Sequence, residues 1–280
     1  MEVAFERLVR FKSTDGRVLY GEAPAGDVYP WTSCAIPVYE GISPWDLRLT
    51  EETASVAEVL CPLAYTPIIY GIGLNYKTHI AEAKWPTPAY PTVFMKPPGA
   101  LNGPFSDIAV DPACRQIDYE GELVVIIGKD CKNVASPNEA LDAVLGYTVG
   151  NDVSSRDWQV PDVSGNQHGY AKSFDGFAPM GPVILSANLV PDVGKLKLQT
   201  LVNGEVRQAA QLDDLLFGVG DIIMHLSRGT TLKAGTAIMT GTPGGVAAFM
   251  KPQAWLQNGD VVEVVITEIG TIRSRFIVPT

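Results

Sequence analysis

The chain has 280 residues, of which 46% are hydrophobic and 19% are charged, and its formal net charge at pH 7 is −10. This length can bury a substantial core, arranged as one large domain plus a small one. The negative charge argues against nucleic-acid and anionic-membrane partners, because both would repel the protein. It does not argue against an anionic substrate, since a bound cation and a few basic side chains can invert the local field.

The four cysteines form no Cys-x-x-Cys pair and are too sparse for a disulfide scaffold. Reduced thiols in an intracellular protein are the simplest explanation. No stretch reaches the length of a transmembrane helix, and the N-terminus lacks a basic segment followed by an apolar one. The sequence therefore predicts a soluble, intracellular protein, placed in the cytoplasm.

Residues 1–64 are predicted to form a small β-rich N-terminal domain. Apolar segments flank Asp15-Gly16, which is a strong signal for a β-hairpin. The segment 41–61 is more polar and is expected to hold a candidate short helix at 51–60, EETASVAEVL. Pro62 and Pro67 then bracket a domain boundary near residue 65.

Residues 65–280 are predicted to form the larger domain, with many short strands and few helices. The helix expected from Ser136 should bury a stripe formed by Leu141, Val144 and Leu145. The expected elements, in chain order, are a strand at 68–73, a buried strand at 123–127, a helix that starts at Ser136, an apolar run at 144–150, a hairpin around Asn203-Gly204, helical spacing interrupted by glycines over 212–226, and a last strand pair at 261–267 and 271–278. The helix at Ser136 has Pro137 at its first position, and Glu139 completes a capping box with Ser136. This pattern predicts an α+β, mostly β fold rather than a doubly wound sheet. The absence of a G-x-G-x-x-G motif after a strand and of a P-loop argues against a nucleotide cofactor.

Three acidic residues are the strongest candidates for chemistry. Glu120 and Glu122 stand where the buried strand begins, and side chains two residues apart on a strand point the same way. Two such carboxylates repel each other unless a positive charge lies between them. A hard divalent cation, Mg²⁺ or Mn²⁺, meets that demand, and Asp152 can supply a third oxygen. The alternative is a solvated pair at a strand edge, which is common on protein surfaces.

His79 and Glu82 form a second candidate pair. In a helix, residues three apart share a face, so the carboxylate can fix the imidazole tautomer and raise its basicity. That arrangement is typical of a general base for water. The alternative is a solvated surface pair. The proline- and aromatic-rich stretch that follows is either a lid over a site or a surface loop.

Arg156 and Lys172 are further basic candidates, although a lysine among aromatic residues is more often a snorkelling surface residue. The loop 240–245, TGTPGG, offers amides and hydroxyls that can hold an anion, but most such loops are merely turns. His168 and His225 have no evident partner and are interpreted as structural or surface residues.

Taken together, these segments resemble the fumarylacetoacetate hydrolase family, in its short acylpyruvase-like and oxaloacetate-decarboxylase-like branch. The match runs over about residues 66–280 and rests on six motifs in the right order. They are N-Y-x-x-H-x-x-E from Asn75, F-M-K-P from Phe94, D-Y-E-G-E-L from Asp118, G-Y-T-V-G-N-D-V-S-S-R-D-W-Q from Gly146, A-K-S-F-D from Ala171, and T-G-T-P-G-G-V from Thr240.

The resemblance implies the family's mixed β-roll with a small N-terminal domain, paired as a homodimer. It implies Mg²⁺ or Mn²⁺ bound by the positions that match Glu120, Glu122 and Asp152. It implies a water-activating dyad of His79 and Glu82, with Lys172 facing the developing negative charge. Substrate-binding roles fall on Arg156, Gln159 and Thr242. Many members of the branch carry arginine where this chain has Leu74, which leaves the substrate open.

The implied substrate is a small 2-oxo acid that chelates the cation and reacts through a metal-stabilised enolate. The first interpretation is hydrolysis of the C–C bond of a 3-acylpyruvate, because the full dyad of His79 and Glu82 is present. Decarboxylation of oxaloacetate or of a related β-keto acid, including a biosynthetic one, is the alternative, as is a hydratase or isomerase reaction. A non-catalytic protein that binds a metal or ligand is the remote alternative.

Overall fold

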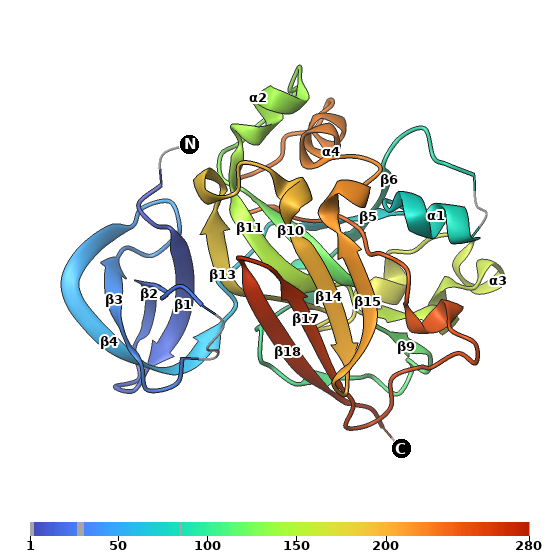
Figure 1. Ribbon diagram of the computed structural model, residues 1–280, viewed down its shortest axis with the longest axis horizontal. Helices are drawn as coiled ribbons and strands as arrows, with labels where there is room; N and C mark the ends of the chain where they lie inside the picture. The colour runs from blue at the N-terminus through green and yellow to red at the C-terminus, as the bar shows by residue number, and fades with distance from the viewer. Residues whose placement is uncertain (1–2, 27–30, 84–85, 280) are drawn as a thin grey trace.

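The computed structural model describes residues 3–26, 31–83 and 86–279, without the side chains of residues 82 and 83. Its strands form one sheet of 11 strands, a second of five strands and a two-stranded ribbon (Figure 1). The helices are short, and the architecture is mostly β, as the sequence predicts. No helix in this described part is long and apolar enough to cross a membrane. All four cysteines are free in this structure.

The elements are defined as follows. The large sheet runs in the order β2 (Val18–Glu22), β3 (Ala35–Glu40), β4 (Arg48–Leu60), β1 (Arg7–Ser13), β13 (Ala178–Ser186), β11 (Val144–Asn151), β10 (Gly121–Ile127), β16 (Ala237–Met239), β5 (Ile69–Gly73) and β6 (Thr92–Lys96), with β7 (Leu101–Asn102) beside β13. The second sheet runs β15 (Glu205–Gln211), β14 (Lys197–Val202), β17 (Val261–Ile266), β18 (Gly270–Ile277) and β8 (Ile108–Ala109), and β9 (Ile117–Asp118) pairs with β12 (Ser154–Ser155). The helices are α1 (Lys77–Ala83), α2 (Pro137–Leu141), α3 (Pro161–Ser164) and α4 (Val219–Leu226).

The N-terminal strands β1–β4 lie together at the left of Figure 1. The predicted hairpin is confirmed, since β1 and β2 pair antiparallel across a turn in which Gly16 has a φ of +89°. The helix suggested for residues 51–60 is wrong, because this segment belongs to the long strand β4. β4 pairs with both β1 and β3, and these ladders outweigh the helical preference of its Glu and Ala residues. The boundary near residue 65 falls between β4 and β5 and remains a prediction.

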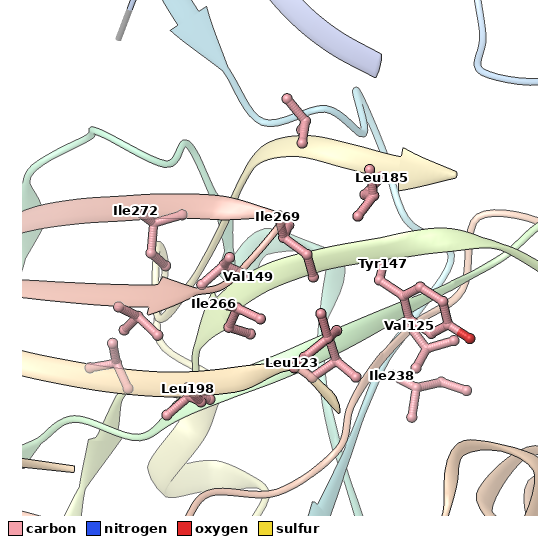
Figure 2. Packing of buried hydrophobic residues seen from close by; sticks show 14 of the residues in the cluster. Leu123, Val125, Tyr147, Val149, Leu185, Leu198, Ile238, Ile266, Ile269 and Ile272 are labelled. Atoms are coloured by element: carbon pink, nitrogen blue, oxygen red, sulfur yellow. The ribbon is translucent and has the colours of Figure 1, made fainter. Parts of the chain in front are cut away.

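The core lies between the two larger sheets. Figure 2 shows Leu123 and Val149 of the large sheet on the side of Ile266 of the second sheet. Every residue of β10, β11 and β13 is buried, because both faces of these strands are covered. Strands buried on both faces are expected to be continuously apolar, which is how the sequence of β10 reads after Glu122.

The remaining expected elements are mostly confirmed. β14 and β15 form the predicted hairpin, with left-handed φ values of 51° at Asn203 and 81° at Gly204. The last strand pair is β17 and β18. The helix at Ser136 is present as α2, and its Ser136 hydroxyl accepts a hydrogen bond from the Glu139 amide.

The predicted stripe of α2 is wrong. The helix ends at Leu141, whose side chain is exposed, whereas Val144 and Leu145 are buried residues of β11. The helical spacing over 212–226 becomes a short 3₁₀ turn followed by α4. Gly218, the N-cap residue of α4, lies between the 3₁₀ turn and α4.

Candidate metal centre

The three candidate carboxylates meet at one end of the strand pair β10 and β11. Gly121 of β10 lies opposite Asn151 of β11, so Glu120 and Asp152 flank the same end of the antiparallel pair. Glu122 points to the same side as Glu120, as residues two apart on a strand do. Ligand oxygens of these three residues all lie within 4.8 Å of one another, and all three side chains are buried.

Cationic side chains surround two of the three carboxylates. Lys172 Nζ lies 2.7 Å from Glu120 Oε2 and 2.5 Å from Asp152 Oδ2. Burial opposes the charged form of Lys172, but these two carboxylates outweigh it and raise the lysine's pKa. The Arg156 guanidinium ion-pairs with both Asp118 and Glu120. Burial alone would raise the pKa of Glu120, yet Arg156 and Lys172 hold it below its usual range.

Glu122 has no ion pair within the described ranges of the chain. Its Oε2 accepts a hydrogen bond of 2.6 Å from the Gly241 amide. Burial, followed by the charges of Asp152 and Glu120, raises its pKa well above the usual value. Two unit charges 4.8 Å apart repel by about 3 kcal/mol at an effective dielectric constant of about 20. This buried, converging set of oxygens therefore fits a hard divalent cation such as Mg²⁺ or Mn²⁺.

The glycine-rich loop at 240–245 serves this centre directly. Gly241 has a φ of +104°, and a Cβ there would lie 2.8 Å from the Asn75 Cβ, so only glycine fits without a shift. The sequence suggested that this loop holds an anion, and the anion that the Gly241 amide contacts is the Glu122 carboxylate. The Thr242 hydroxyl donates to the Gly121 carbonyl and accepts from Gln208, which fixes the loop to the start of β10.

A cleft of about 450 Å³ opens above the carboxylates. Of the nine predicted site residues, six line it and two, Glu122 and Asp152, are buried outside its lining. The backbone of the ninth, Glu82, lies in α1, but its side chain is outside the described residues. The lining residues are Gly73, Leu74, His79, Pro86, Thr92, Phe94, Glu120, Arg156, Gln159, His168, Lys172, Thr242, Val246 and Phe249.

Two of the lining residues have restricted orientations. His79, on α1, is 8% exposed, and its ring packs edge-on against Phe249 at a centroid distance of 5.4 Å. Gln159 accepts a hydrogen bond of 2.8 Å from Arg156 through Oε1. Its Nε2 is buried and has no hydrogen-bond partner within the described part of the protein. Gln159 therefore lines the cleft with a side-chain amide whose donor is not used by the described part of the protein.

Sequence reasoning missed three residues of this region. His168 was interpreted as structural or surface, yet it lines the cleft, where burial and the charge of Lys172 lower its pKa. Asp118 holds Arg156 and also accepts hydrogen bonds from the backbone amides of residues 247 and 248. Lys96 lies fully buried against Asp152. For Lys96, the signal available in the sequence was a lysine within the F-M-K-P motif at an inward-facing position of a strand.

His225, the other histidine without an evident partner, lies outside the cleft lining. It is half-buried on α4, and its ring stacks on Tyr90 at a centroid distance of 5.8 Å. Its interpretation as a structural residue agrees with this position.

Comparison with known proteins places these features in context. The family model described as "Fumarylacetoacetate (FAA) hydrolase C-terminal" matches residues 68–277. An uncharacterized protein of Archaeoglobus fulgidus is 42% identical over 242 residues, covering 85% of this chain and 91% of its own length. The human mitochondrial oxaloacetate tautomerase FAHD2A is 36% identical over 218 residues, covering 78% of this chain and 69% of its own. The crystal structure of 2-hydroxyhepta-2,4-diene-1,7-dioate isomerase from Mycobacterium marinum superposes with a TM-score of 0.82 at 33% identity, covering 98% of both chains.

Proposed function

Because this chain belongs to the fumarylacetoacetate hydrolase family, we propose that it is a divalent-metal-dependent enzyme that interconverts the keto and enol forms of oxaloacetate or a closely related 2-oxo acid. The observation that carries the proposal is the buried carboxylate cluster beneath a cleft lined by Arg156, Lys172 and His79. The relatives' names point in the same direction, since they include an oxaloacetate tautomerase and an isomerase of a dioate.

The cluster of Glu120, Glu122 and Asp152 would hold the cation. When bound there, Mg²⁺ or Mn²⁺ would act as a Lewis acid toward the carboxylate and keto oxygens of the substrate and favour its enolate. Lys172 contacts Glu120 and Asp152 at the floor of the cleft, so its ammonium group is fixed where negative charge develops.

His79 is the proposed base. Its imidazole would accept a proton from C3 of the keto form, and the resulting imidazolium would return a proton to the C2 oxygen to complete the enol. The ring is held edge-on against Phe249, so its orientation toward the cleft is restricted before substrate arrives. The donor of Gln159 Nε2 would bind a substrate oxygen at the edge of the cleft.

Hydrolysis of a 3-acylpyruvate is the second candidate. It is favoured by the helical conformation of residues 77–83, which gives His79 and Glu82 the spacing of neighbours on one helical face. Here His79 would deprotonate a water that attacks C4, and cleavage of the C3–C4 bond would release pyruvate and a carboxylic acid. Decarboxylation of oxaloacetate uses the same enolate but needs no activated water.

One set of assays separates these reactions. Oxaloacetate and acetylpyruvate are each incubated with the protein plus Mg²⁺ or plus a chelator, and both enol absorbance and pyruvate release are followed against a protein-free control. Metal-dependent relaxation of the enol signal without pyruvate release supports the tautomerase. Pyruvate from acetylpyruvate supports the hydrolase, and pyruvate from oxaloacetate beyond the control supports the decarboxylase. Metal-independent or absent turnover of both compounds would contradict the proposal.

The proposal also retains the homodimer that the resemblance implies. Light scattering coupled to size exclusion would check it, with a mass of twice the chain mass as the expected result. A monomer at micromolar concentration would contradict this part of the proposal and leave the reaction untouched.

A further inference from the structure

Lys96 is a buried lysine for which the proposed reaction has no role. It ends β6, the edge strand of the large sheet. Along β6, Thr92 and Phe94 line the cleft while Val93 and Met95 are exposed, so the inward positions alternate as a strand requires. Lys96 is the third inward position and has an exposed fraction of 0%. A lysine side chain in such a place is rare unless it is paired.

The ammonium group of Lys96 is fully engaged. Its Nζ donates to Asp152 Oδ1 at 2.5 Å, to the Phe177 carbonyl at 2.5 Å and to the Val153 carbonyl at 3.3 Å. Three acceptors require three N–H donors, which only the charged ammonium form provides. The three acceptors belong to two segments of the chain, so Lys96 ties β6 to the residues that follow β11 and to the start of β13.

This contact fixes Asp152 Oδ1 outside the centre and leaves Oδ2 on the side of the centre, where it pairs with Lys172. Lys96 holds Oδ1, while Oδ2 lies on the side of Lys172 and Glu120. We propose that Lys96 is a positioning residue of the metal centre, which holds the Asp152 carboxylate in the orientation that directs Oδ2 toward the cation. The inference rests on the metal centre of the proposed function and adds a residue that does not touch the substrate cleft.

A role of Lys96 as a nearby positive charge and a role as a positioning residue predict opposite effects of its removal on cation affinity. If Lys96 acted only as a positive charge near the site, its removal would strengthen cation binding, because the local field would become more negative. If it positions Asp152, its removal frees the carboxylate to rotate and weakens cation binding. Outer partners that orient metal ligands typically contribute 10- to 100-fold to metal affinity. We therefore expect at least a tenfold rise in the dissociation constant.

The test uses Mn²⁺ alone as the probe and measures its binding by electron paramagnetic resonance and calorimetry, without substrate. Lys96→Met keeps the side-chain volume and removes all donors, so its affinity should fall at least tenfold. Lys96→Gln is shorter and has only two donors, so a smaller loss of several-fold is expected. Lys233→Met is the matched control, because Lys233 is 63% exposed and pairs with the surface residue Asp130.

The outcomes are distinguishable. Unchanged or tighter Mn²⁺ binding in folded Lys96→Met would overturn the positioning role. If Lys96→Met does not fold, Lys96→Gln decides, and wild-type affinity in that variant would overturn the inference in the same way. Absence of Mn²⁺ binding to the wild-type protein would instead overturn the metal centre itself. Circular dichroism of each metal-free variant separates loss of the fold from loss of the site.

Discussion

Replacing Glu122 with glutamine is expected to stabilise the metal-free protein while it weakens cation binding. Glu122 is 1% exposed, and its pKa is raised by burial and by the nearby Asp152 and Glu120 carboxylates. Glutamine has nearly the same shape, and its amide oxygen can still accept the hydrogen bond from Gly241. The substitution therefore removes a charge without removing the contact.

The size of the effect follows from proton linkage. A carboxyl group whose pKa is raised by folding has its full stabilising contribution below the unfolded pKa, and loses it as the pH rises toward the folded pKa. The usual pKa of Glu122 is 4.5, and each pH unit above it costs about 1.4 kcal/mol until the folded pKa is reached. At pH 7 the upper limit is about 3 kcal/mol. The variant should gain nothing near pH 4.5 and up to that amount at pH 7.

Urea unfolding in the presence of a chelator at pH 5 and pH 7 measures this difference, and Mn²⁺ titration measures the loss of affinity. Glu51→Gln is the matched control, because Glu51 is exposed on β4 and its variant should show no pH-dependent gain. A Glu122→Gln protein that is less stable than wild type at pH 7 without metal would refute the electrostatic reasoning. Undiminished Mn²⁺ affinity would refute the assignment of Glu122 as a ligand.

Three further substitutions test other parts of the centre. Gly241→Ala should lower the free energy of unfolding, measured by urea titration, by about 2–4 kcal/mol, because the residue has a left-handed φ and its new Cβ would overlap a neighbour. A loss under about 1 kcal/mol would contradict this reasoning. Arg156→Lys should reduce kcat/KM at least about tenfold with the fold intact, since a lysine cannot pair with the Asp118 and Glu120 carboxylates at once as the guanidinium does. A wild-type kcat/KM would show that the double ion pair of Arg156 is dispensable. His79→Ala should slow the metal-dependent keto–enol interconversion of oxaloacetate by about a hundredfold or more, because the proposed base at C3 is lost. A wild-type rate in this variant would contradict that role.

Local signals in the sequence were enough to predict much of this structure. The turns at Asp15-Gly16 and Asn203-Gly204 depend on residues that tolerate positive φ, so their hairpins are encoded within a few positions. The spacing of Glu120 and Glu122 predicted a shared face, and the structure brings both together with Asp152. These are properties of short segments or of motifs that keep their order along the chain.

Features that depend on distant segments were not predictable in this way. Residues 51–60 contain good helix formers, and only pairing with β1 and β3 makes them a strand. Lys96 acquires its environment from Asp152 and Phe177, which are 56 and 81 residues away in the sequence. Neither partner can be inferred from the residues around Lys96. His168 likewise became a cleft residue only through the folding of the chain around it.

The pairing of β1 with β13 means that the N-terminal strands shield an edge of β13 from pairing with other chains. Arg7 and Leu8 lie opposite Leu185 and Ile184, so β1 covers one edge of a strand that is otherwise part of the core of the larger unit. Removing residues 1–64 would expose that edge, and an uncovered, apolar strand edge is a template for pairing with other chains. Among the residues that the structure describes, those that line the cleft all come from outside this segment. Its loss would therefore be seen first as aggregation, with the carboxylate cluster still encoded in the remaining chain.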